Sequence, residues 1–274
     1  MDWSRLGPAY PRGLPLLLAA LALLAPLDQG FGTVSPNAFA STTNRSLEQK
    51  LAALRAEAQA TPRSAQAWRR LGEALLLAGR PSEAISPLHR AASIESRSGE
   101  AWLRLGRAYA AAGYRKHALA AYQRAVKLSP ADPTAWFALG VEEEHLNHPA
   151  RALPAFEKVC RLAPSSVAWF NLGIVSGEVN HFPEATRAYQ KSLELEPGNV
   201  EAWNNLGVAY EKLGRPHEAL QAYSKAFLLQ PNNPTILQNI TRVGAQVRSS
   251  PKGSPLPVRS AQPVSRSKSM TRSP

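Results

Sequence analysis

The sequence has a single cysteine among its 274 residues, and this scarcity excludes several classes of protein. One cysteine cannot form the internal disulfide framework on which many small secreted domains depend. Cys160 also lies far from the apolar stretch near the amino terminus, where a lipid-anchored protein would need its cysteine. We therefore interpret Cys160 as a small apolar residue of a helix.

Catalytic motifs are missing as well. The chain contains no phosphate-cradling glycine loop, nucleophile elbow or Cys-x2-Cys pair. The best cluster of polar ligands is Glu144 with His148, which could share a metal only if one helix carried both residues. Because Asn147-His148-Pro149 is a turn signal, we expect His148 to lie beyond the helix. The sequence thus predicts a protein that is not an enzyme and holds no metal or cofactor.

Acidic residues are absent from the final segment, 249–274, which carries five basic residues among many Ser and Pro. Such a segment has too little apolar surface to form a core, so we expect a disordered basic tail. It supplies +5 of the net charge of +12. Attraction of about 1 kcal/mol per cation to an anionic membrane makes binding to an anionic surface or polymer an alternative function.

Long apolar runs are scarce, and the main one extends only from Leu14 to Leu27, downstream of two arginines. A membrane-spanning helix needs about 20 apolar residues, more than this run offers. The small-x-small pattern Ala38-Phe39-Ala40 predicts a signal peptide over 1–40, cleaved before Ser41, in preference to a retained membrane anchor. Either interpretation places the rest of the chain outside the cytosol, in the periplasm or another extracytosolic compartment.

Tryptophan is also rare, yet five of the six tryptophans recur at an almost constant spacing along the chain. Each of these five is followed three residues later by Leu and four residues later by Gly. They are Trp68, Trp102, Trp136, Trp169 and Trp203. A constant period of about 34 residues is typical of repeat proteins, in which stacked copies bury a continuous core and each copy contacts only its neighbours.

The second half of each repeat has its own pattern. An alanine stands sixteen residues after each Trp and a large apolar residue twenty after it, and a proline closes four of the five copies. The spacing places each set on one stripe of a helix, so every repeat is expected to be a helical hairpin. The recurring glycine predicts a close contact at the helix crossing, with the alanine opposite it. Gly or Asn is expected to end the first helix in a left-handed cap.

This pattern closely resembles the Trp-x2-Leu-Gly-x2-Tyr, Ala-x3-Phe, Pro signature of the tetratricopeptide repeat family. The resemblance implies an all-α solenoid of about five hairpins with capping helices at both ends. The expected segments are a half-repeat over 44–62, repeats over 65–98, 99–132, 133–165, 166–199 and 200–233, and a terminal capping helix over 234–248. Repeats three and four lack the aromatic residue that ends the first stripe and have Glu143 and Ser176 there.

The resemblance also implies where a partner would bind. In the family the first helices line a concave surface and expose the residues one, two and five positions after the Trp. This projection gives the candidate groove residues Arg69, Arg70, Arg104, Arg107, Phe137, Phe170, Asn171, Asn204 and Asn205. A groove that is basic, then apolar, then rich in amides would suit a protein or peptide with an acidic segment. The alternative is that these are ordinary solvated or half-buried helix residues.

Comparison of these residues with known kinds of tetratricopeptide repeat protein narrows the range of partners and activities that we expect. Asn171 and Asn205 match the asparagine that holds peptide backbone in the repeat arrays of sugar-transferring enzymes, but the segment after the array, 249–274, is too short for a transferase domain. Clamping of chaperone tails is disfavoured, because Arg69 and Glu73 replace the Lys and Asn that such clamps use. Nucleic acid is an unlikely partner, since RNA-reading helical repeats lack this register. We expect a scaffold that binds a partner protein, or alternatively an accessory subunit of an enzyme complex.

Overall fold

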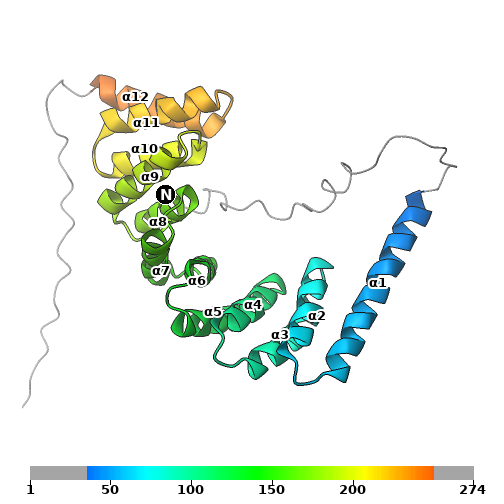
Figure 1. Cartoon of the computed structure of the whole chain (residues 1–274). Helices are drawn as coiled ribbons and strands as arrows, with labels where there is room; N and C mark the ends of the chain where they lie inside the picture. Colours follow the sequence, from blue (N-terminus) through cyan, green and yellow to red (C-terminus); the bar gives the residue numbers. More distant parts are fainter. Residues whose placement is uncertain (1–35, 250–274) are drawn as a thin grey trace, which may run out of the picture. The chain divides into compact units, whose positions relative to one another are not determined.

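The computed structural model describes residues 36–249, and this part of the chain consists of twelve α-helices with no strand (Figure 1). The predicted all-α fold of five helical hairpins with terminal helices is confirmed. The helices are α1 (Pro36–Ala60), α2 (Ala65–Leu77), α3 (Pro81–Ile94), α4 (Gly99–Ala111), α5 (Arg115–Leu128), α6 (Pro133–His145), α7 (Pro149–Leu162), α8 (Ser166–Glu178), α9 (Phe182–Leu195), α10 (Val200–Lys212), α11 (Pro216–Leu229) and α12 (Pro234–Ser249).

The chain divides into two compact units, and α6 crosses the boundary between them. In unit 1, which ends at Glu142, α2 pairs with α3 and α4 with α5, and α3 also packs against α4. In unit 2, which begins at Glu143, α8 pairs with α9 and α10 with α11, and α12 packs against α11. Each helix therefore contacts mainly its sequence neighbours, as expected for stacked repeats.

The turn inside every hairpin has a residue with positive φ, a conformation that favours Gly and Asn. Three of these residues are glycines and two are asparagines. They are Gly79, Gly113, Asn147, Asn180 and Gly214, with φ from 60° to 83°. The predicted left-handed caps are confirmed. Proline stands in the first two positions of the next helix in four hairpins and begins it without losing a helical hydrogen bond.

Four of the five repeats are joined to the preceding segment through the indole of their Trp. The indole Nε1 of Trp68, Trp136 and Trp203 donates to the carbonyl of the proline six residues earlier, at 2.9 to 3.1 Å. Trp102 makes the same bond to the carbonyl of Ser96 at 3.1 Å. The coupling of Trp to the closing residue of the previous repeat thus has a structural cause: the indole N–H satisfies a carbonyl just beyond a helix end.

The recurring glycine lies against the large residue of the second helix. A Cβ atom built on Gly106, Gly173 or Gly207 would lie 2.5 to 2.6 Å from the ring of Tyr122, Tyr189 or Tyr223, and one on Gly72 would collide with Leu88. The sequence predicted the close contact correctly but placed alanine opposite the glycine. The nearest atoms belong instead to the large residue four positions after that alanine, because its side chain reaches across the helix crossing.

The two terminal helices cover the ends of the array. Helix α1 buries Leu51 and Ala58, and α12 buries Ile236 and Val243. Helix α1 begins at Pro36, eight residues before the predicted start, because no Gly or Pro interrupts the chain between residues 37 and 60. It therefore includes the predicted cleavage position after Ala40. The apolar run at 14–27 and most of the basic tail lie outside the described residues.

Two prolines lie inside second helices. Pro87 in α3 is buried and Pro154 in α7 is exposed, and both helices continue beyond them. Each proline removes one backbone donor from its helix. Among residues 36–249 no helix is both long enough and apolar enough to cross a membrane.

Candidate functional site

The first-helix face of unit 1 consists of the residues one, two and five positions after the Trp of α2 and α4. Arg104 of α4 reaches Glu73 of α2, with its Nε 2.6 Å from the Glu73 carboxylate, so the two helices adjoin along this face. The Arg104 guanidinium also lies 2.6 Å from Glu100. Its charge is therefore balanced by two carboxylates, and hydrogen bonds to both raise the pKa of Arg104 against the opposing effect of burial.

The other predicted cations of this face differ in their surroundings. Arg70 is paired with Glu57 of α1 at 3.1 Å. Arg69 is half-buried and Arg107 exposed, and neither forms an ion pair within the described part of the chain. Of the four arginines predicted to attract an acidic partner, Arg69 and Arg107 thus keep an uncompensated charge.

The charge is distributed unequally along the described helices. Residues 45–142 contain 15 Lys and Arg against 8 Asp and Glu, a net charge of +7. Residues 143–248 contain 10 of each kind and are neutral. The excess of positive charge among the described side chains therefore lies in unit 1. Screening limits its reach to about 8–10 Å at ordinary ionic strength.

The predicted amides of unit 2 already have partners within the protein. Asn171 is buried and its Nδ2 donates to the Val167 carbonyl at 2.8 Å. Asn204 is buried as well and accepts a hydrogen bond from Asn239 of α12 at 3.0 Å. The side-chain oxygen of Asn205 accepts a hydrogen bond from Asn204 Nδ2 at 3.4 Å. These amides would have to exchange an internal partner before they could hold a peptide backbone.

The two predicted aromatic anchors, Phe137 in unit 1 and Phe170 in unit 2, are both half-buried. The ring of Phe170 packs against Tyr189, with 6.0 Å between the ring centroids. Leu103, at the first exposed position of the projection, is buried in the core. Part of this projected surface is therefore core.

The end of α6 carries three consecutive carboxylates. Glu142 is buried and lies 3.1 Å from Arg115 in unit 1, while Glu143 is buried in unit 2 and lies 2.9 Å from His148 Nδ1. Burial and the nearby charge of Glu178 raise the pKa of Glu144 to about 7. Desolvation also raises the pKa of Glu178.

This arrangement does not form the metal pair considered from the sequence. His148 lies beyond the end of α6, as predicted, and its partner is Glu143 instead of Glu144. Within the described residues no group of three metal-binding side chains comes together.

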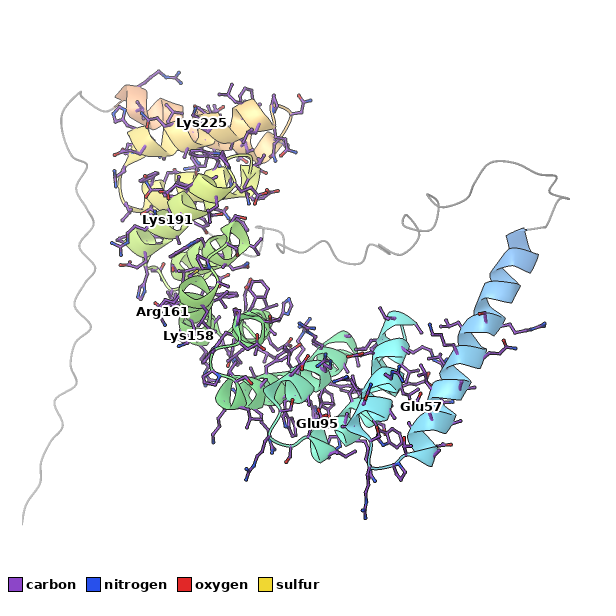
Figure 2. All side chains as sticks on the ribbon, in the orientation of Figure 1. Glu57, Glu95, Lys158, Arg161, Lys191 and Lys225 are labelled. Carbon is purple, nitrogen blue, oxygen red and sulfur yellow. The ribbon has the colours of Figure 1, made fainter. Side chains whose placement is uncertain are left out.

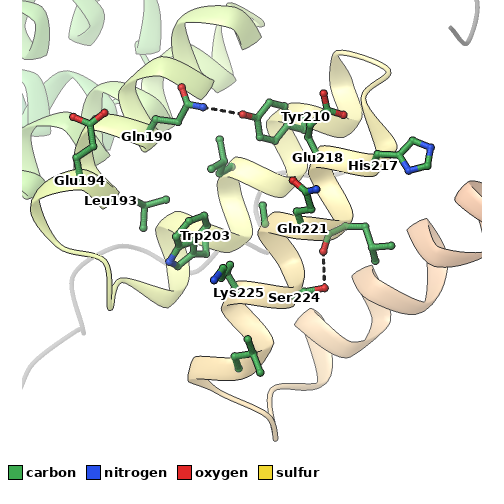
Figure 3. A pocket seen from close by; sticks show the side chains of 14 residues that line it. Gln190, Leu193, Glu194, Trp203, Tyr210, His217, Glu218, Gln221, Ser224 and Lys225 are labelled. Carbon is green, nitrogen blue, oxygen red and sulfur yellow. Dashed lines mark hydrogen bonds between the residues drawn. The ribbon is translucent and has the colours of Figure 1, made fainter. Parts of the chain in front are cut away.

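The sequence projection missed a groove on the second helices of unit 2. We call it the outer groove: α9 and α11 form its walls and α10 its floor, around a cleft of about 990 Å³ (Figure 3). The apolar and aromatic lining consists of Leu193, Trp203, Leu206, Tyr210, Leu220, Ala222 and Leu228. A second cleft of about 420 Å³ shares Gln190 and Tyr210 with the first.

The outer groove has one signal in the sequence. One position near the end of the second helix is polar in the first four repeats, where it is Ser93, Lys127, Arg161 and Glu194. In the fifth repeat it is Leu228, which is 72% exposed. At other positions the second helices of unit 2 carry cationic side chains, which include Lys158, Lys191 and Lys225 (Figure 2).

Solved structures of other repeat proteins share the fold. The protein YrrB, described as a TPR protein with an unusual peptide-binding site, is 21% identical, covers 68% of this chain and 96% of its own, and superposes with a TM-score of 0.63. A MamA protein is 23% identical over 61% of this chain and 92% of its own, with a TM-score of 0.58. MamA from Desulfovibrio magneticus RS-1 is 24% identical over 62% and 97%, with a TM-score of 0.57.

At sequence identities of 21% to 24%, the likeness to these solved structures establishes the fold alone. Comparison with curated proteins gives no significant match. The model of the cilia and flagella-associated protein 70 C-terminal domain, a tetratricopeptide repeat domain, matches residues 17–249 and so includes every hairpin. The chain therefore belongs to the family of cilia and flagella-associated protein 70 C-terminal domains, within the tetratricopeptide repeat proteins.

Proposed function

We propose that the protein is a noncatalytic scaffold that binds an acidic segment of a partner protein on the first-helix face of unit 1. The observation that carries this proposal is the pair of uncompensated cations, Arg69 and Arg107, on a face whose other arginines are neutralised. Unit 1 also has a net charge of +7 over its described side chains. Such a field steers an acidic ligand and fixes its register more than it adds affinity.

The fold supports the same proposal. Tetratricopeptide repeat folds are typical of proteins that bind other proteins, and one of the similar structures is described as having a peptide-binding site. A stacked array presents long surfaces made of many helices and does not converge on a catalytic pocket. Phe137 of α6, in the same unit, is half-buried and can supply an apolar contact to a ligand.

Replacing Arg69 and Arg107 together by alanine should weaken binding of acidic peptides about 2- to 30-fold, because exposed charge pairs contribute about 0.2–1 kcal/mol each. The probe is a set of short peptides selected from a random display library on the full chain, with affinity measured by fluorescence anisotropy. The salt dependence of binding should also fall.

The matched control is Arg90→Ala with Arg97→Ala, which removes the same charge from exposed positions away from the first-helix face. Arg104→Ala should have a smaller effect than Arg107→Ala, because its charge is already balanced. Selected peptides without Asp or Glu, or equal losses in both double variants, would contradict the proposal.

The proposed location is outside the cytosol. It rests on the apolar run at 14–27 and the small-x-small pattern before Ser41. Amino-terminal sequencing of the protein from its native cells should find a chain that begins at Ser41. A soluble cytosolic pool that retains Met1 would contradict this part of the proposal and would leave peptide binding unaffected.

A further inference from the structure

The outer groove has the composition of a peptide-docking surface. Its floor presents the rings of Trp203 and Tyr210 between apolar side chains of both walls (Figure 3). Gln190 of α9 donates to the Tyr210 hydroxyl at 2.8 Å, and the Arg215 guanidinium lies 4.8 Å from the Tyr210 ring centroid. These contacts hold the Tyr210 ring in place where the two clefts meet.

Repeat five departs from its counterpart in unit 1 at this surface. In repeat two the Arg124 guanidinium covers the Trp102 ring at 4.0 Å from the centroid. The equivalent residue in repeat five is Lys225, whose side chain lines the cleft beside Trp203. Together with the exposed Leu228, this leaves an apolar and aromatic groove open on unit 2.

We propose that residues 255–259 of this chain, Pro255-Leu256-Pro257-Val258-Arg259, dock in the outer groove. The segment lies outside the described residues, and its sequence has the chemistry that the groove fits. Alternating prolines favour the polyproline II conformation, which costs little entropy to bind and docks in aromatic-lined grooves. Leu256 and Val258 supply the apolar side chains that would cover Trp203 and Leu228.

Reach supports this occupant. The carboxylates Glu194 and Glu218 line the groove, but each already forms an ion pair, with Lys191 at 2.7 Å and with Arg215 at 2.8 Å. Lys225 lines the groove as well, so the choice of occupant rests on its apolar side chains and its distance along the chain. The segment begins six residues after Ser249, the last residue of α12, and α12 packs against α11, a wall of the groove. An extended chain advances about 3.1 Å per residue, so the segment can reach about 19 Å from that point.

The protein would then cover its own outer groove, and any other ligand of this surface would have to displace the segment. The inference concerns unit 2 and does not depend on the acidic partner proposed for unit 1. A tethered segment experiences an effective concentration of roughly 1 mM, so a dissociation constant of about 0.2 mM would keep it bound about four fifths of the time.

The test measures how fast a maleimide labels Gln221→Cys, an exposed position on the rim of the groove, in the full chain. Cys160 does not interfere, because burial raises the pKa of its thiol to about 12 and the thiolate is the reactive form. Adding Leu256→Asp and Val258→Asp should speed the labelling of position 221 about fivefold. Ala120→Cys, the equivalent exposed position in repeat two, should react at the same rate with and without the tail substitutions.

Equal labelling rates at position 221 in the intact and substituted tails would overturn the proposal. A rise at positions 221 and 120 alike would also overturn it, since that result indicates general loosening of the fold. The protection should not change over a hundredfold dilution of the protein, because the docking is intramolecular. Protection that disappears on dilution would assign the groove to the tail of a second copy and contradict the proposal.

Discussion

Gly173→Ala is expected to lower the free energy of unfolding by about 1–3 kcal/mol, as overpacking of a filled core typically does. A Cβ atom at this position would lie 2.6 Å from two atoms of the Tyr189 ring. That ring cannot withdraw, because it is buried and packs against Phe170. Urea unfolding followed by circular dichroism measures the change.

Gly177→Ala is the matched control on the same helix. A Cβ atom at Gly177 would have no neighbour within 4 Å, although the residue is buried. Alanine should therefore stabilise α8 there by up to about 1 kcal/mol through its higher helix propensity. The two substitutions should act in opposite directions. A similar loss from both would show that the glycine contact with the large residue does not determine the packing of the hairpin.

Glu144→Gln is expected to stabilise the protein at pH 8 by on the order of 1–3 kcal/mol and to leave stability at pH 4 nearly unchanged. The folded protein raises the pKa of Glu144 from the usual 4.5 to about 7, through burial and the charge of Glu178. The folded state thus favours the protonated acid. Glu144 therefore does not destabilise the folded protein below pH 4.5, where both states hold its proton. The destabilisation by Glu144 grows as the pH rises toward 7.

The measurement is the free energy of unfolding of each variant and the unsubstituted protein between pH 4 and pH 8. The exposed Glu157→Gln on α7 serves as the control for removing a carboxylate from the surface. The Glu178→Gln variant should also reduce the pH dependence, because it removes the charge that helps to raise the pKa of Glu144. A constant difference between Glu144→Gln and the unsubstituted protein over this range would contradict the assigned burial.

Prediction from the sequence was most successful where the cause is local. The left-handed caps at Asn147 and Asn180 depend on the φ preference of a few residues, and the structure confirms them. The nine candidate groove residues were chosen by register alone. Register indicates which side of a helix a residue occupies, but it does not indicate whether another helix supplies a partner. Arg104 and Arg107 occupy equivalent faces, yet only Arg104 is held between carboxylates.

The sequence by itself determined the repeat, its hairpins and the family, because the nearly constant spacing of the tryptophans specifies contacts between neighbours in the chain. Only the tertiary structure decided which side chains remain available to a ligand. Glu73 neutralises Arg104 across 31 residues, and Asn239 binds Asn204 across 35. The outer groove exists because α9 and α11 stand on either side of α10, and no single helix contains its lining. Such contacts depend on how helices stack, and stacking brings together residues whose pairing no local pattern records.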